Sequence, residues 1–109
     1  CPVCGRPMKV NLRADQYFVE DKAWDQAARR YSDFIESIGE RNVVYVEFGV
    51  GYNTPDIIRY PFEQYVYRNP NAYLIRFNKD YQEGAKENVD KTISFTEDIE
   101  YVLEKMQGR

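Results

Sequence analysis

The sequence predicts an α/β fold: a partial Rossmann-like parallel sheet of three strands with flanking helices, preceded by half of a zinc-ribbon knuckle. Three observations predict it. Runs of β-branched and aromatic residues alternate with segments of helical period. A glycine-containing loop follows the first of these runs, and two cysteines open the chain. Alternating strands and helices are typical of parallel sheets with crossover connections. We expect a knuckle and loop segment over residues 1–23 and the sheet over residues 24–109.

Composition limits the possible partners. The chain has 109 residues, a net charge of −3 and a pI of about 5.0, with acidic and basic residues interspersed. This balance argues against nucleic acid as a partner. No apolar run is long enough for a membrane span, and no charged leader precedes an apolar run, so we expect no membrane partner and a cytoplasmic location. The chain begins without Met, which we interpret as the mark of a piece cut from a longer protein.

The two cysteines, Cys1 and Cys4, stand in the motif CPVCG. This spacing lets both thiolates bind one Zn²⁺, and Gly5 permits the tight turn that follows. Structural zinc takes four ligands, and the sequence contains no His. The motif therefore predicts half of a Cys4 site, completed outside this chain or by a second copy. A redox pair and two plain thiols remain alternatives.

The first half of the chain contains one strong helix signal. Apolar residues recur with helical spacing from Trp24 to Ile38, and Gly39 follows them, which predicts a helix over residues 24–38. Before it, alternating apolar residues predict two short extended pieces, over residues 8–12 and 15–21.

The second half alternates strands and helices. A continuous apolar run predicts a strand over residues 42–48 that is covered on both faces. Thr54 and Pro55 are a good N-cap and first residue for the next helix, which Pro61 should divide into two pieces. Further strands are expected over residues 72–77 and 91–95.

The closing helix is expected from Ile99 to Met106. Ser94 or Thr96 is a suitable N-cap, and Gly108 ends the helix.

Ligands of parallel α/β sheets bind at the carboxyl ends of the strands, which here are residues 47–53 and 78–80. Because Gly49 and Gly51 lack Cβ atoms, their backbone can approach a pyrophosphate closely, and a helix N-terminus nearby favours an anion. Thr54 replaces the third glycine of the usual dinucleotide fingerprint. The loop could equally be a plain turn. It could also bind S-adenosylmethionine, with Asp80 on the ribose hydroxyls.

Five segments together resemble the carboxyl-terminal half of the sirtuins, most closely the divergent microbial branch linked to macrodomain proteins. In order they read CPVC, NLRADQYFVED, VVYVEFGVGYNTP, LIRFNKD and TEDIEYVLEKM. The resemblance implies an NAD-dependent protein deacylase or protein ADP-ribosyltransferase. Residues 24–109 would then be the carboxyl-terminal half of its Rossmann-like NAD-binding domain.

The resemblance also implies the site residues. Three departures weaken the match: the loop lacks the family's hydroxyl residues, Val19 replaces a glycine, and Asp80 replaces a glutamate. The NAD phosphates would be ringed by Gly49, Val50, Gly51 and Asn53. The ribose would lie at Asn78, Lys79 and Asp80, and the adenine near Asp98. The substrate channel would include Phe18, Val19 and Glu20, and zinc would bind Cys1 and Cys4.

In the sirtuins the opening glycine loop, the first cysteine pair and the catalytic base come from the amino-terminal half. The resemblance therefore implies that this chain holds no catalytic residue and is inactive alone. Its partners would be the amino-terminal half of the same protein and an acylated or ADP-ribosylated protein substrate. Without that half, an apolar sheet face and ten tyrosines could drive homo-oligomer formation. A methyltransferase fragment and a non-catalytic nucleotide-binding module remain alternatives.

Overall fold

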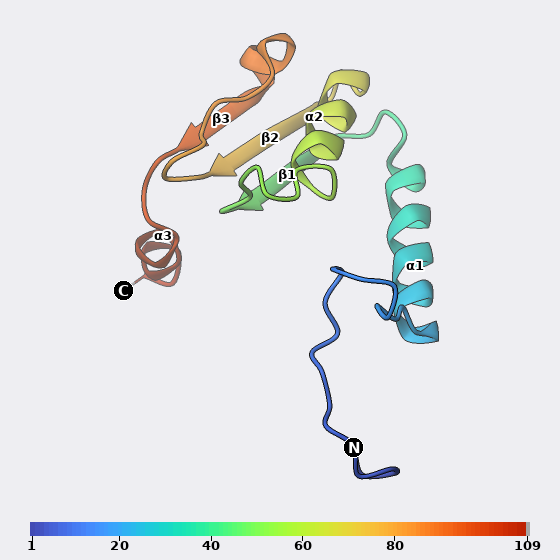
Figure 1. Ribbon diagram of the computed structural model, residues 1–109. Coiled ribbons are helices and arrows are strands. Elements are labelled where there is room, and N and C mark those ends of the chain that lie inside the picture. Colours follow the sequence, from blue (N-terminus) through green and yellow to red (C-terminus); the bar gives the residue numbers. More distant parts are fainter. Residues whose placement is uncertain (109) are drawn as a thin grey trace. The chain divides into compact units, whose positions relative to one another are not determined.

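A three-stranded parallel sheet is the central element of the computed structural model, which describes residues 1–108 (Figure 1). Its strands are β1 (Val43–Phe48), β2 (Ala72–Phe77) and β3 (Thr92–Phe95), paired in the order β1-β2-β3. Helix α2 (Arg59–Arg68) connects the first two strands, and a short 3₁₀ helix, η1 (Lys86–Lys91), precedes the third. The α/β fold with three parallel strands and flanking helices that the sequence predicts is confirmed.

The chain divides into two units, Cys1–Ser37 and Ile38–Arg109, and the sheet belongs to the second. In the first unit the predicted helix is confirmed as α1 (Lys22–Ile38), two residues longer at its start than expected. The side chain of Asp21 explains that start, because its Oδ1 accepts a hydrogen bond from the Trp24 N–H at 2.8 Å. No helix in the described residues is long and apolar enough to cross a membrane.

The prediction of two short strands before α1 is wrong, because residues 8–12 and 15–21 form turns and irregular backbone. The side chain of Asn11 forms the backbone hydrogen bonds that a neighbouring strand would otherwise provide. Its side chain donates to the Val19 carbonyl at 2.9 Å and accepts from the Val19 N–H at 3.0 Å. A side chain that satisfies both backbone groups of one residue can hold a loop closed without a ladder.

One face of the sheet packs against α2 and forms the core (Figure 1). Leu74 of β2 and Val66 of α2 are buried there. The Tyr45 ring of β1 packs against Phe62 and Tyr65 of α2, with ring centroids 5.0 and 5.7 Å apart. This contact fixes the helix over the first two strands.

Among the described residues the opposite face is exposed, so the expectation of a β1 strand covered on both faces is wrong for this chain. Val44 and Val46 are 54% and 43% exposed. At the carboxyl ends of the strands, Phe48, Phe77 and Phe95 stack in a row, with centroids 4.9 and 5.0 Å apart. The apolar face that the sequence predicts to be left open is thus present.

The helix after the glycine loop begins later than predicted. Residues 55–58 form turns, and α2 starts at Arg59 with Ile58 in the N-cap position, so Thr54 is not its cap. Pro61 lies in the first turn of α2, where a missing N–H costs nothing. The prediction that Pro61 divides the helix into two pieces is wrong, because α2 runs from Arg59 to Arg68 through Pro61 without a break.

The closing helix is confirmed as α3 (Ile99–Met106). Its N-cap is Asp98, whose Oδ1 accepts from the Glu100 N–H at 2.9 Å, and neither Ser94 nor Thr96. Gly108 follows the helix with φ +75°, as expected of a residue that ends a helix.

Candidate nucleotide site

The ends of β1 and β2 are joined through the carbonyl oxygen of Val50. Asn78 donates to it from Nδ2 at 2.9 Å, and Arg59 donates from Nη1 at 3.0 Å. In a trans peptide the C=O and the following N–H point in opposite directions. Because the Val50 carbonyl is bound on the inner side, the Gly51 N–H points outward. The loop therefore presents a backbone donor at the carboxyl edge of the sheet, where parallel α/β folds bind ligands.

The two glycines of the loop have different roles. Gly49 has φ +65°, and its N–H is used by the Phe77 carbonyl at 2.8 Å, so it turns the chain and extends the sheet. A Cβ on Gly49 would lie 3.2 Å from Ile99 Cδ1. Gly51 has no left-handed φ, and a Cβ there would be in ordinary contact with Tyr81. Glycine at position 49 is thus favoured by the turn itself, whereas a glycine at position 51 is not needed for the backbone conformation and leaves room for a ligand.

Two adjoining hollows flank this loop and share Gly49 and Gly51 in their linings. The loop hollow has a volume of about 440 Å³, and the acidic hollow about 270 Å³. Each of the eight residues predicted to bind the cofactor lines one or both of them. The loop hollow is lined by Gly49, Val50, Gly51, Asn53, Thr54, Ile57 and Ile58. The acidic hollow is lined by Gly49, Gly51, Asn78, Lys79, Asp80, Tyr81, Glu97, Asp98 and Ile99.

The charges of the two hollows differ. No charged side chain lines the loop hollow, and the outward N–H of Gly51 is suited to a phosphate oxygen. The acidic hollow carries Asp80, Glu97 and Asp98 against Lys79. Carboxylates repel phosphate but accept hydrogen bonds from ribose hydroxyls and amino groups. The arrangement therefore suits a molecule with its phosphates at the loop and its sugar beside the acids.

Arg59 supports the loop from inside the protein. It is 1% exposed, although arginine side chains are mostly exposed in folded proteins. Besides Val50, it donates to the carbonyls of Tyr81 at 3.0 Å and Glu83 at 2.5 Å, and to the Tyr52 hydroxyl at 2.9 Å. Among the described residues it forms no ion pair with a carboxylate. A buried positive charge thus lies beneath the glycine loop, where it favours an anion.

A second buried arginine, Arg76, secures the segment that follows Asn78. It pairs with Glu47, with Glu63 at 3.0 Å and with the Glu83 carbonyl at 2.6 Å. Burial alone would lower the pKa of Arg76, but the hydrogen bonds and charges of Glu47 and Glu63 outweigh it and raise the pKa. Glu47 is therefore held in a buried ion pair with Arg76 and is not exposed to solvent.

The exposed side of this support is the pair Tyr52 and Glu83. The Tyr52 hydroxyl donates to Glu83 Oε1 at 2.9 Å, and the Tyr52 ring lies 4.2 Å from the Arg59 guanidinium carbon. The Glu83 backbone N–H and the Tyr52 hydroxyl lower the pKa of the Glu83 carboxyl, and Arg59 adds to this effect. Burial and the hydrogen bond to Glu83 raise the pKa of Tyr52. The pair bridges the loop after β1 and the segment after β2.

Two predicted ligand residues already have structural duties. Asn78 is 6% exposed, and its Oδ1 accepts from the N–H groups of Asp80 at 3.2 Å and Tyr81 at 2.9 Å. The Asp98 side chain caps α3. The side chains of Lys79 and Asp80 are exposed. Of the four residues predicted to contact the ribose and adenine, Lys79 and Asp80 thus have the side chains best placed to reach a ligand.

The predicted substrate segment and the cysteines lie in the first unit. Arg13 pairs with Glu20 and stacks on the Phe18 ring at 4.3 Å, which orders the residues around Val19. Cys1 and Cys4 are exposed free thiols, and Gly5 closes their turn with φ +70° and an N–H bond to the Cys1 carbonyl at 2.9 Å.

In the described part of the chain, no group of three or more His, Cys, Asp or Glu residues could hold a metal ion. Cys1 and Cys4 fit at most half of a zinc site.

The arginines were missed in the sequence, although one signal was present. Glu47 and Arg76 are each the fifth residue of an otherwise apolar run, and they are register partners in the sheet. Opposite charges at matching positions of neighbouring strands predict a buried pair. No comparable signal marks Arg59, whose partners are backbone carbonyls distant in the sequence.

Comparison with known proteins finds sequence similarity to proteins named ADP-ribosyltransferase. No protein-family model matches the chain. It is 36% identical over 104 residues to a protein ADP-ribosyltransferase of Staphylococcus aureus (strain Mu50 / ATCC 700699), covering 94% of this chain and 33% of that protein. It is 32% identical over 78 residues to a probable bifunctional ADP-ribose hydrolase/ADP-ribosyltransferase of Fusarium oxysporum f. sp. cubense, covering 63% of this chain and 12% of that protein. The chain thus spans a third or less of the length of these relatives, and it is similar to a part of proteins named ADP-ribosyltransferase.

Proposed function

We propose that this chain is the carboxyl-terminal part of a sirtuin-type protein ADP-ribosyltransferase that uses NAD, and that it supplies one wall of the NAD site. A protein deacylase of the same type is the alternative reaction. The observation that carries the proposal is the junction at the Val50 carbonyl, where Asn78 and Arg59 hold the two strand ends together. The names of the relatives support the transferase over the deacylase.

In this proposal the pyrophosphate lies in the loop hollow and receives a hydrogen bond from the Gly51 N–H. The positive charge of Arg59, beneath the loop, stabilises the negatively charged phosphate without direct contact between the two groups. The adenosine ribose lies in the acidic hollow, where Asp80 accepts hydrogen bonds from its hydroxyls. Lys79 lies between the two charged regions of the ligand and can approach a phosphate oxygen.

The reaction itself requires a second part of the protein. Breaking the bond between nicotinamide and ribose demands close positioning of the acceptor and the ribose carbon, and this chain offers no imidazole for proton transfer. We propose that the amino-terminal half of the same protein packs on the open sheet face. That face, with Val44, Val46 and the stacked ring of Phe77, remains apolar and uncovered in the described residues.

A structural zinc ion is the second cofactor in the proposal. Cys1 and Cys4 would bind it together with two ligands from outside this chain, and it would hold the loop segment in place without taking part in the reaction. The zinc content of the longer protein, with and without Cys4→Ser, tests this assignment separately.

The proposal is tested by nucleotide binding to the isolated chain. ADP-ribose should shift the amide resonance of Gly51, and Asp80→Ala should weaken binding by about fivefold or more, the loss of one or two hydrogen bonds to a ligand. Glu104→Ala, which removes an exposed carboxylate of α3, is the matched control and should bind like the wild type. S-adenosylmethionine binding without ADP-ribose binding would instead indicate a methyltransferase fragment.

Activity separates the enzyme from a non-catalytic binding module. The isolated chain should release no nicotinamide from NAD, and joining it with the amino-terminal half should restore the release. Turnover by the isolated chain at an enzyme-like rate would refute the division of labour proposed here.

A further inference from the structure

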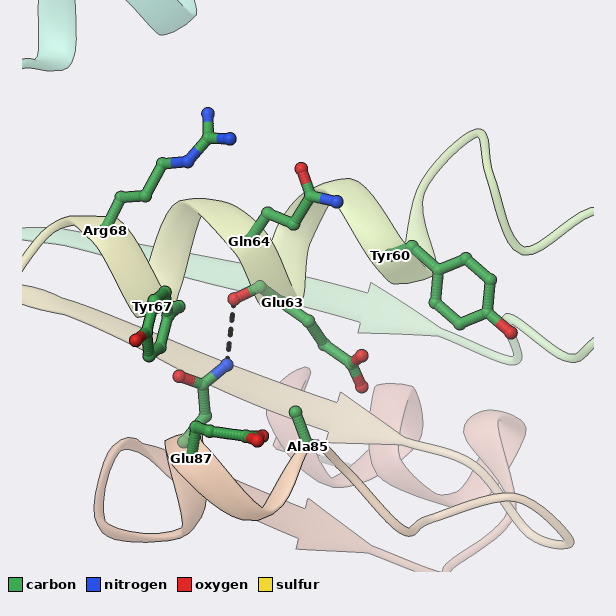
Figure 2. A pocket seen from close by; sticks show the side chains of 8 residues that line it. Tyr60, Glu63, Gln64, Tyr67, Arg68, Ala85 and Glu87 are labelled. Carbon is green, nitrogen blue, oxygen red and sulfur yellow. Dashed lines mark hydrogen bonds between the residues drawn. The ribbon is translucent and has the colours of Figure 1, made fainter.

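A second pocket lies on the helix side of the sheet, away from the glycine loop. It has a volume of about 480 Å³ and is formed between α2 and η1 (Figure 2). The rings of Tyr60 and Tyr67 and the methyl group of Ala85 form its apolar walls. Nothing in the proposed NAD site uses this pocket.

The pocket contains a buried acceptor without a donor. Asn88 is 1% exposed and donates from Nδ2 to the Glu63 carbonyl at 2.8 Å. The Glu63 carbonyl can only accept, so the amide nitrogen must face it and Oδ1 must face away. In the described structure, Asn88 Oδ1 has no hydrogen-bond partner. A buried acceptor of this kind is destabilising until an N–H or O–H group reaches it.

Two carboxylates, Glu63 and Glu87, and one guanidinium, Arg68, line the pocket. Figure 2 shows the carboxylates of Glu63 and Glu87 extending toward the side where Ala85 lies, whereas Arg68 extends away from η1. Arg76 does not neutralise Glu63 fully, because it also pairs with the buried carboxylate of Glu47. Two carboxylates, two aromatic rings and an unsatisfied amide oxygen together favour a cation that carries N–H donors.

We propose that this pocket binds an alkylguanidinium group, the side-chain chemistry of arginine. A guanidinium is planar and presents its N–H groups as a fork, so one edge can pair with a carboxylate while another N–H is directed toward the buried amide oxygen. It is also weakly hydrated and stacks on tyrosine rings, which an ammonium does less well. The group could belong to a partner polypeptide or to a small molecule, and both have the same recognition chemistry.

The test uses the 109-residue chain and N-acetyl-arginine amide, followed by NMR. The ligand should shift the side-chain amide of Asn88 and the rings of Tyr60 and Tyr67, with a Kd in the millimolar range expected of a fragment-sized ligand, about 1–10 mM. The neutral citrulline analogue should bind at least about threefold more weakly, because it has the shape of arginine without the charge.

Variants connect the binding to the pocket. Glu87→Gln and Tyr67→Ala should each weaken binding by about two- to fivefold, the worth of one exposed ion pair or cation–π contact. Both residues are exposed, so the fold should survive the changes. Glu104→Gln, which makes the same charge change on α3, should bind like the wild type.

Further arms of the experiment distinguish the sources and the outcomes. A short arginine peptide that binds more tightly than the amide would indicate a polypeptide partner, whereas equal binding would indicate a small molecule. The proposal is overturned if citrulline binds as well as arginine, if a lysine analogue binds more tightly, or if no shift occurs up to about 50 mM ligand, well above the expected Kd.

Discussion

Replacing Arg59 by Met removes the group that joins the two loops of the candidate site while keeping an unbranched stem of similar length. The wild-type guanidinium makes four hydrogen bonds, to the carbonyls of Val50, Tyr81 and Glu83 and to the Tyr52 hydroxyl. At about 1 kcal/mol net for each bond, their loss costs about 4 kcal/mol. Releasing a buried charge that has no carboxylate partner returns part of this energy, so we expect a destabilisation of about 2–4 kcal/mol.

Urea unfolding followed by circular dichroism measures this loss. With a urea dependence of about 1 kcal/mol per M for a small domain, the midpoint should fall by about 2–4 M, or the variant should be unfolded without urea. Arg68→Met is the matched control, because Arg68 is exposed on the same helix and its change should stay within about 0.5 kcal/mol. Arg59→Lys should fall between the two, since an ammonium reaches fewer carbonyls at once.

The same variant tests the orientation of the loop. Without Arg59, the Val50 carbonyl keeps only the bond from Asn78, and the amide of Gly51 should shift and broaden in NMR spectra. Equal urea midpoints for Arg59→Met and Arg68→Met, with an unchanged Gly51 amide, would refute the view that Arg59 holds the site together.

Four further substitutions have defined outcomes. Gly49→Ala should cost about 1–2 kcal/mol because of its left-handed φ, whereas Gly51→Ala should leave the urea midpoint within about 0.5 kcal/mol of the wild type and weaken only ADP-ribose binding. Asp98→Ala should cost about 1 kcal/mol through loss of the α3 cap, measured by urea unfolding; an unchanged midpoint would mean that the cap is unimportant. Glu83 has a lowered pKa, so its stabilisation is present above its ordinary pKa of 4.5 and is lost as the pH falls through the folded-state value. Urea midpoints of the wild type and Glu83→Gln should therefore converge in acid, and a constant difference down to pH 2 would contradict the lowered pKa of the Glu83 carboxyl.

The sequence by itself determined the parallel sheet, the long first helix and the edge at which the candidate site lies. These depend on local pattern: apolar runs of strand length, helical spacing up to Ile38, and a glycine after β1 that needs φ +65°. The neighbouring positions of the Gly51 loop and Asn78 follow from them, because adjacent parallel strands end at the same edge.

Only the tertiary structure decided what holds that edge in place. Arg59 is charged and begins a helix, so its sequence favours the surface, yet it is buried because carbonyls from two distant loops converge on it. Asp98 became a cap, because its backbone adopts the extended conformation just before α3. The sheet face that carries Phe77, opposite α2, is a second example. A local sequence pattern identifies an apolar strand, but it does not identify the element that covers the strand. Burial depends on contacts between segments far apart in the chain, and local periodicity carries no information about them.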